Sequence, residues 1–325
     1  MGCLIWCTPE EPGMTPLSRR SFLALSTLLP SAMLAQTSNS QTAAAPMNSA
    51  PQNQTNGQQQ DQKNYQKRDQ KKPLPVGLEL YSVRDELKRD PQATVRAVAK
   101  MGYQGVEFYA PYLAWTEAET KDMRKLLDEL GIRCFSTHND ADYLVGDKLS
   151  QVRDRNLILG SSYVVQSSAP KIDKLEGWKT VADNLNAVGA KLEPSGLKAG
   201  YHNHQPEFTP LDGKRPIEIL AANTKSSIML QLDVGTCLET GSDPVEWIRA
   251  NPGRIKSLHL KDWSPDPAQG YKVLFGEGAA EWPDIFTAAE TVGGAEYYLM
   301  EQEGSRFPEL ETAQKCLESY RTLRG

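Results

Sequence analysis

The 325-residue chain has no excess of basic residues, few cysteines and few histidines, and these shortages exclude several classes of protein. Its 36 lysines and arginines are outnumbered by 41 aspartates and glutamates, and the net charge of -5 argues against nucleic acid or an anionic membrane as the main partner. No apolar run reaches the ~18 residues that span a bilayer, so we expect no stable membrane span. The widely spaced Cys134, Cys237 and Cys316 form neither a disulfide framework nor a zinc ribbon, and we expect them to pack as small apolar side chains.

The N-terminal region predicts export rather than a folded domain. Within residues 1–35, the run Thr15-Pro-Leu-Ser-Arg19-Arg20-Ser-Phe-Leu-Ala24 matches a twin-arginine signal, and we expect cleavage after Ala35. Residues 36–73 are rich in Gln, Asn, Ser, Thr and Lys with almost nothing to bury, which predicts a disordered linker. We therefore predict a periplasmic protein whose folded domain covers residues 74–325. A cytoplasmic N-terminal extension is the alternative.

The remaining residues alternate strand-like and helix-like runs. The predicted strands are 76–81, 105–109, 132–137, 162–166, 197–201, 228–232, 255–260 and 297–300, and the predicted helices are 91–101, 116–130, 147–159, 175–192, 216–222, 244–250, 282–292 and 308–323. Such alternation implies parallel strands, and eight units in this length predict a closed (β/α)8 TIM barrel of the α/β class. An open doubly wound sheet is the alternative, but its glycine-rich turn after the first strand is missing, because Tyr81-Ser-Val-Arg-Asp-Glu86 stands there.

The chain has four histidines, and each lies at or just past a predicted strand end. In a parallel barrel these ends converge on one face, where catalytic groups gather. We predict a metal site with one ligand from each of strands five to eight, namely His202, Asp233, His259 and Glu301. Two imidazoles and two carboxylates suit Mn²⁺, our first choice, or Zn²⁺, Co²⁺ or Fe²⁺, better than Ca²⁺ or Mg²⁺. The alternatives are a chance scatter, a helix-capping role for Asp233 and a hydrogen-bonded core histidine at 259.

Several motifs carry a family resemblance. The segments Tyr201-His-Asn-His-Gln-Pro-Glu-Phe208, Leu232-Asp-Val-Gly235, Leu258-His-Leu-Lys-Asp262 and Tyr298-Leu-Met-Glu-Gln-Glu303 resemble the xylose-isomerase-like TIM barrels, often called the sugar phosphate isomerase/epimerase family. Members include ketose epimerases, inosose dehydratases, abasic-site endonucleases and keto-glycoside lyases. The resemblance implies ligands of type Glu, Asp, His and Glu on strands five to eight. Asp233, His259 and Glu301 match, but His202 replaces a glutamate that the epimerases use in proton transfer.

These features predict a divalent-metal-dependent isomerase or epimerase that passes through an enediolate of a small sugar. Predicted catalytic residues are Glu301, His204, His138 and Lys261, and predicted substrate-binding residues are Glu107, Glu207 and Trp263. Elimination by a keto-glycoside lyase or dehydratase is the first alternative, and a non-catalytic periplasmic sugar-binding barrel is the second. A nuclease is disfavoured because the basic face and further metal ligands are missing.

Predicted export also bears on the substrate. Sugar phosphates are cytoplasmic metabolites, and the loop Gly276-Glu277-Gly278 puts a carboxylate where many barrels bind phosphate. Both points favour an unphosphorylated sugar or keto-sugar. An oligomer is compatible with the sequence.

Overall fold

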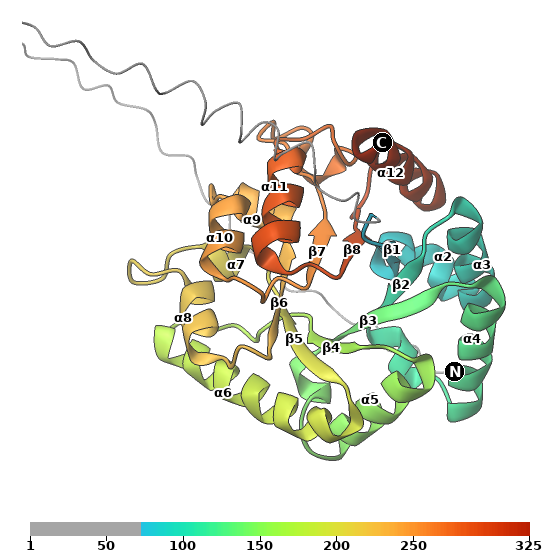
Figure 1. Cartoon of the computed structure of the whole chain (residues 1–325), viewed down its shortest axis with the longest axis horizontal. Coiled ribbons are helices and arrows are strands. Elements are labelled where there is room, and N and C mark those ends of the chain that lie inside the picture. The colour runs from blue at the N-terminus through green and yellow to red at the C-terminus, as the bar shows by residue number, and fades with distance from the viewer. Residues whose placement is uncertain (1–72) are drawn as a thin grey trace, which may run out of the picture. The chain divides into compact units, whose positions relative to one another are not determined.

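The computed structural model describes residues 73–325, and the predicted export signal and linker lie outside them apart from Pro73. Eight parallel strands form a closed barrel, with β1 paired to β8 (Figure 1). The strands are β1 Val76–Glu79, β2 Gly105–Phe108, β3 Arg133–Asn139, β4 Tyr163–Gln166, β5 Lys198–His202, β6 Met229–Asp233, β7 Ser257–Leu260 and β8 Tyr297–Met300. The predicted barrel is confirmed.

The helices surround the barrel, as Figure 1 shows. They are α2 Arg84–Arg89, α3 Pro91–Met101, α4 Glu117–Leu130, α5 Gly146–Leu159, α6 Leu175–Leu192, α7 Gln205–Phe208, α8 Pro216–Asn223, α9 Val234–Glu239, α10 Pro244–Ala250, α11 Trp282–Ala288 and α12 Glu309–Arg324. Local sequence sets their ends: Thr116 and Glu119 form a reciprocal capping box at the start of α4, and Gly131 ends it with φ 66°. None of the described helices is long and apolar enough to cross a bilayer.

The structure corrects several predicted boundaries. The first strand stops at Glu79 and turns into a 3-10 segment, Leu80–Val83. The short helices α2, α7 and α9 follow strands β1, β5 and β6 and were not predicted. The helix predicted to run to residue 292 is α-helical only to Ala288 and continues as a π-turn, Ala289–Gly293. These differences all fall at strand or helix ends, where the periodic apolar pattern is weakest.

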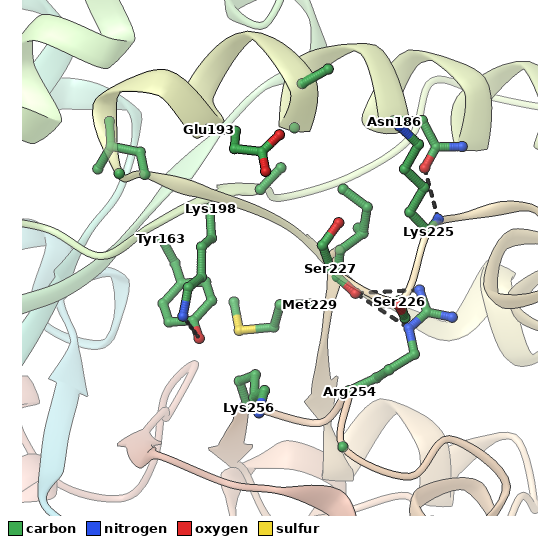
Figure 2. Close-up of a pocket in the computed structure, with 17 residues that line it drawn as sticks. Tyr163, Asn186, Glu193, Lys198, Lys225, Ser226, Ser227, Met229, Arg254 and Lys256 are labelled. Carbon is green, nitrogen blue, oxygen red and sulfur yellow. Dashed lines mark hydrogen bonds between the residues drawn. The ribbon is translucent and has the colours of Figure 1, made fainter.

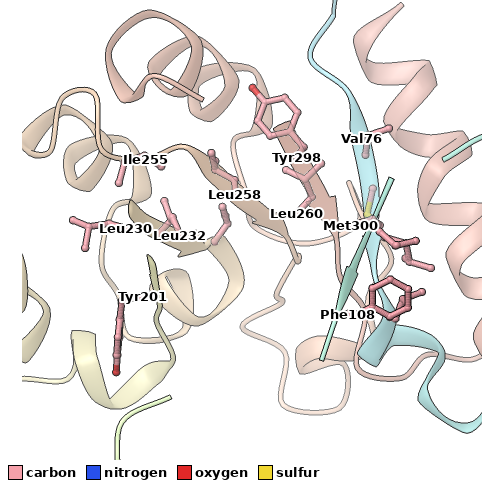
Figure 3. Packing of buried hydrophobic residues seen from close by; sticks show 14 of the residues in the cluster. Val76, Phe108, Tyr201, Leu230, Leu232, Ile255, Leu258, Leu260, Tyr298 and Met300 are labelled. Carbon is pink, nitrogen blue, oxygen red and sulfur yellow. The ribbon is translucent and has the colours of Figure 1, made fainter. Parts of the chain in front are cut away.

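Side chains alternate between the outer and inner surfaces of the barrel, because successive residues of a strand point to opposite faces. On β6, Leu230 and Leu232 join the large apolar cluster that also contains helix residues such as Leu185, and Figure 3 shows part of this cluster. The intervening Gln231 and the following Asp233 therefore point into the barrel, where hydrogen bonds join them to groups from other strands.

The barrel interior is apolar at one end and polar at the other. A small separate cluster fills the end near the strand starts, and it consists of Phe135, Tyr163, Val165, Met229, Tyr297 and Leu299. Glycine makes room for it: a Cβ on Gly105 would lie 2.5 Å from the Phe135 ring. Above this plug, toward the strand ends, the inward residues are polar or charged, which places the candidate site at the carboxyl end of the barrel.

Candidate active site at the carboxyl end of the barrel

A cavity of about 340 Å³, here called the site cavity, opens at this end. One part of its lining consists of the imidazoles of His138, His202 and His204. Another consists of the carboxylates of Glu79, Asp140, Glu301 and Glu303, and no lysine or arginine of the described chain lines it. The structure therefore brings together three of the four histidines and Glu301, one of the acidic residues that the sequence predicted at strand ends.

His259 lies beneath this cavity, fully buried between two carboxylates. Its Nδ1 bonds to Glu301 Oε2 and its Nε2 lies 2.8 Å from Glu107 Oε2. Burial alone would lower the pKa of His259, but Glu301 and Glu107 outweigh it and raise the pKa to about 10. Both ring nitrogens of His259 thus face carboxylates, and this arrangement favours the protonated ring. The predicted ligand is here the partner of two carboxylates.

Glu107 was predicted to bind substrate, and in the structure it lies behind His138 without lining the site cavity. Its side chain is fully buried and contacts His259, His138 and Gln231. Burial raises the pKa of Glu107, yet the two imidazoles outweigh burial and lower it to about 2. Its role in the structure is to orient and balance the charge of the histidines.

Gln231 on β6 fixes the orientation of two other imidazoles. Its Oε1 accepts from His138 Nε2 at 2.7 Å and from His202 Nδ1 at 3.1 Å, while its Nε2 donates to Glu107 at 3.1 Å. With Nδ1 of His202 donating, its Nε2 keeps a lone pair, and this atom lies 3.9 Å from Asp233 Oδ2. Burial and the neighbouring His259 hold the pKa of His202 well below its usual value, so His202 is neutral.

Asp233 and Glu301 face one ammonium group. Lys261 Nζ lies 3.3 Å from Asp233 Oδ2 and 3.7 Å from Glu301 Oε1, and it also contacts Glu303. Burial lowers the pKa of Lys261, but these carboxylates raise it well above its usual value, so the ammonium stays charged. Lys261, a predicted acid, does not line the site cavity. Asp233 also accepts from Thr236 N–H, so the predicted helix-capping alternative is realised in addition.

The donor atoms fit a divalent ion. One ligand atom from each of His202, Asp233 and Glu301 lies within 4.8 Å of the others, which is close enough for one ion to reach all three. A second group, His138, His202 and His259, meets the same distance condition. The first group is better suited to bind a divalent cation, because His202 keeps a free lone pair and the two carboxylates supply negative charge.

The other predicted substrate-binding residues have structural contacts. Glu207 accepts from Tyr201 OH at 2.5 Å and from His204 N–H at 2.9 Å, which fixes the start of α7. Trp263 is half-buried and does not line the site cavity. Glu277 was expected to repel a phosphate group of the substrate. It lies outside the site cavity and accepts hydrogen bonds of 2.6 and 2.8 Å from Arg306, so it does not contact a substrate in this cavity.

Three residues at the site were not assigned a role from sequence. Gln231 is the residue that bonds to both imidazoles and to Glu107, and the sequence feature that could have indicated it is a polar residue at an inward position two before Asp233.

Glu79 lines the cavity, and its Oε2 has no hydrogen-bond partner among the described residues. Burial and the nearby Glu107 raise the pKa of Glu79 well above its usual value. Asp262 accepts from Gly276 N–H and from the indole N–H of Trp282, both at 2.9 Å, and so holds the loop after β7.

Another cavity, of about 410 Å³, lies at the opposite end of the strands (Figure 2). It is lined by the first residues of three strands, Tyr163, Lys198 and Met229, and by several cationic side chains. It contains no histidine and one carboxylate, that of Glu193. Without paired acid and base groups, and at the end of the barrel where conservation serves stability, this cavity is not the candidate active site.

Known proteins with similar sequences include several inosose dehydratases. The chain is 30% identical to an inosose dehydratase of Clostridium perfringens over 192 residues, which is 53% of this chain and 63% of that protein. It is 25% identical to an inosose dehydratase of Geobacillus thermodenitrificans over 190 residues, 52% of this chain and 62% of that protein. The matched region thus spans less than two thirds of these relatives.

Solved structures with the same fold are also found. A sugar phosphate isomerase/epimerase from Parabacteroides distasonis superposes with a TM-score of 0.65 and 26% identity, covering 77% of this chain and 94% of that one. The IolI protein with a bound zinc atom shares the fold, with a TM-score of 0.62 and 18% identity over 77% of this chain and 98% of that one. The family model described as xylose isomerase-like TIM barrel matches residues 95–323, and the chain belongs to this family.

Proposed function

We propose that the protein is a divalent-metal-dependent enzyme that removes the proton next to the carbonyl of an unphosphorylated sugar. The observation that carries the proposal is that Glu301 and the imidazoles of His138 and His204 line one cavity, beside donor atoms that fit one ion. His202, Asp233 and Glu301 would hold the ion. A divalent ion there supplies Lewis-acid stabilisation of the enediolate oxygens.

The chain's own residues divide the proton transfers. Glu301 is kept ionised because, although burial raises its pKa, Lys261 and His259 lower it well below its usual value. Because Glu301 is ionised and lines the site cavity, it is placed to accept the proton, and His204 or His138, which line the same cavity, would deliver one. A carboxylate facing imidazoles, with His202 where epimerases have a second glutamate, suits elimination better than epimerisation. The similarity to inosose dehydratases supports the same outcome.

Isomerisation or epimerisation, the first prediction from sequence, remains the second candidate, and the similarity to a sugar phosphate isomerase/epimerase favours it. The proposed substrate lacks phosphate because the site cavity is lined by four acidic residues and, in the described chain, by no lysine or arginine. Export to the periplasm is proposed from the twin-arginine sequence alone.

The test is incubation of the Mn²⁺-loaded protein with free ketoses, with inososes and with 3-keto-glucosides, followed by mass spectrometry. Elimination predicts loss of water or release of the alcohol, whereas isomerisation changes retention time without changing mass. Binding of these sugars without any product would support the non-catalytic sugar-binding barrel instead. Glu301→Gln should abolish conversion, and Asp183→Ala, at an exposed position on α6, should leave it unchanged.

A further inference from the structure

A second cavity, here called the side groove, adjoins the site cavity. It has a volume of about 690 Å³ and lies between the loop that follows β4 and the loop that follows β5. Ser168 and His204 line both cavities. A molecule that fills the site cavity therefore has an adjacent space into which a second part can extend.

The walls of the side groove are mostly apolar. They are formed by Ala169, Pro170, Ile172, Pro206, Pro210 and Leu211. Lys171 and Asp173, which also line it, lie 3.6 Å apart and neutralise each other. Four prolines, the three just named and Pro216, make this lining stiff, and apolar rigid walls favour a ring rather than a flexible or charged group.

One polar group in the lining has no partner. Trp178 on α6 is 2% exposed, and its indole Nε1 has no acceptor among the described residues. Most buried N–H groups are hydrogen-bonded, and an unmade bond is costly. Nε1 is covered by protein atoms, so a ligand oxygen would supply this acceptor once the lining of the groove shifts to admit it.

The wall shared by the two cavities is held in place. Glu207 accepts from the backbone N–H of His204 and from Tyr201 OH, and Gln205 Nε2 donates to Tyr271 OH at 2.9 Å. The ring of His204 lies 4.9 Å from that of His202, centroid to centroid. His204 is thus fixed beside the candidate metal donors, at the boundary between the two spaces.

We propose that the side groove binds the leaving group of a two-part substrate, a keto-glycoside with an apolar, ring-shaped aglycone that carries a hydrogen-bond acceptor, and that His204 protonates the departing oxygen. This inference rests on the proposed function and specifies its substrate class. The proton next to the ketone is removed and its electron pair forms a C=C bond. The C–O bond to the aglycone breaks, its electron pair stays on oxygen, and one proton from His204 completes the alcohol. No oxidant or water is consumed.

Binding of unreactive sugars tests the groove without any reaction. Titration calorimetry with phenyl and methyl β-D-glucopyranoside should show that wild type binds the phenyl compound about tenfold or more tightly, as expected from burying a ring. Leu211→Asp should remove most of this preference, whereas Leu157→Asp, at an exposed leucine on α5, should keep it. Equal or undetectable binding of the two glucosides by wild type would overturn the side groove as an aglycone site, even if the enzyme proves active.

Two further variants test the named groups. Trp178→Phe should weaken binding of 4-methoxyphenyl glucoside more than binding of phenyl glucoside, because only the former carries an acceptor on its aglycone ring. Equal weakening would assign the indole N–H no role. His204→Gln should slow release from methyl 3-keto-glucoside at least tenfold more than from the 4-nitrophenyl compound, whose oxygen departs without protonation. An equal decrease in the rates of release from the two substrates would overturn the role of His204 as proton donor. If no keto-sugar reacts with wild type but the phenyl preference is present, the proposed function fails and the groove stands.

Discussion

The ammonium group of Lys261 lies 3.3 Å from the carboxylate of Asp233, in the middle of the acidic residues proposed to hold a metal. It also lies 3.7 Å from Glu301, so one ammonium group contacts both carboxylates. A divalent ion bound to the same groups would add positive charge where a positive charge already stands. Lys261 therefore stabilises the metal-free protein and opposes tight metal binding.

Replacing this cation should reveal the competition. Lys261→Met leaves Asp233 and Glu303 without a counter-charge and Glu301 with His259 alone, and we expect the metal-free variant to lose about 3–5 kcal/mol of unfolding free energy. Saturating Mn²⁺ should restore more stability to this variant than to wild type. Urea unfolding with EDTA and with Mn²⁺ measures both effects, and an equal metal-induced gain in the two proteins would contradict the account. Lys121→Met, which breaks an exposed helix pair with Glu117, should cost no more than about 0.5 kcal/mol.

Metal content distinguishes the two candidate ligand groups that contain His202. His202→Ala should abolish stoichiometric metal in either case, since His202 belongs to both. Asp233→Ala and Glu301→Ala should also abolish it, whereas His138→Ala should retain the ion, because we assign the carboxylate-containing group as the site. Elemental analysis of purified protein gives the ratio, with Asp183→Ala as an exposed control. Loss of metal in His138→Ala with retention in Asp233→Ala would favour the three-histidine group.

The barrel and the meeting of its polar strand ends could be predicted from sequence because both depend on local patterns. Strands buried on both faces read as short apolar runs, and helices such as α4 carry their own start and stop residues. The same pattern indicated that His202 and Asp233 would be neighbours on adjacent strands, and the structure confirms a 3.9 Å approach.

The state of each site residue could not be predicted this way. His259 is held between two carboxylates because Glu107, 152 positions away in the chain, contacts its second nitrogen. A buried carboxylate on β2 can contact either the cavity or a histidine on β7. Which of the two it contacts depends on the relative stagger of the strands, and the sequence of one strand does not determine that stagger. The side groove is likewise formed by two loops, whose course apolar periodicity does not specify.

Asp262 should be important for stability rather than chemistry. It is 1% exposed and accepts hydrogen bonds from Trp263, Gly276, Ala280 and Trp282, which tie the loop after β7 to the start of α11. Asp262→Ala leaves these N–H groups unpaired, and we expect a loss of about 2–5 kcal/mol of unfolding free energy. Asp183→Ala should change it by no more than about 0.5 kcal/mol. Urea titration of both variants is the measurement, and similar small effects would show that water replaces the carboxylate.

The apolar plug beneath the site depends on the absence of a side chain at Gly105. A Cβ there would lie 2.5 Å from the Phe135 ring, which is itself held against Tyr297 with ring centroids 4.9 Å apart. Gly105→Ala should therefore cost about 1–3 kcal/mol through overpacking. At Gly200 the nearest atom to an added Cβ is the flexible methyl of Met229, at 2.8 Å, so Gly200→Ala should cost less. Combining Gly105→Ala with Phe135→Leu should recover part of the loss in thermal unfolding. A double variant no more stable than Gly105→Ala would show that the glycine is required for its backbone and not for the space it leaves.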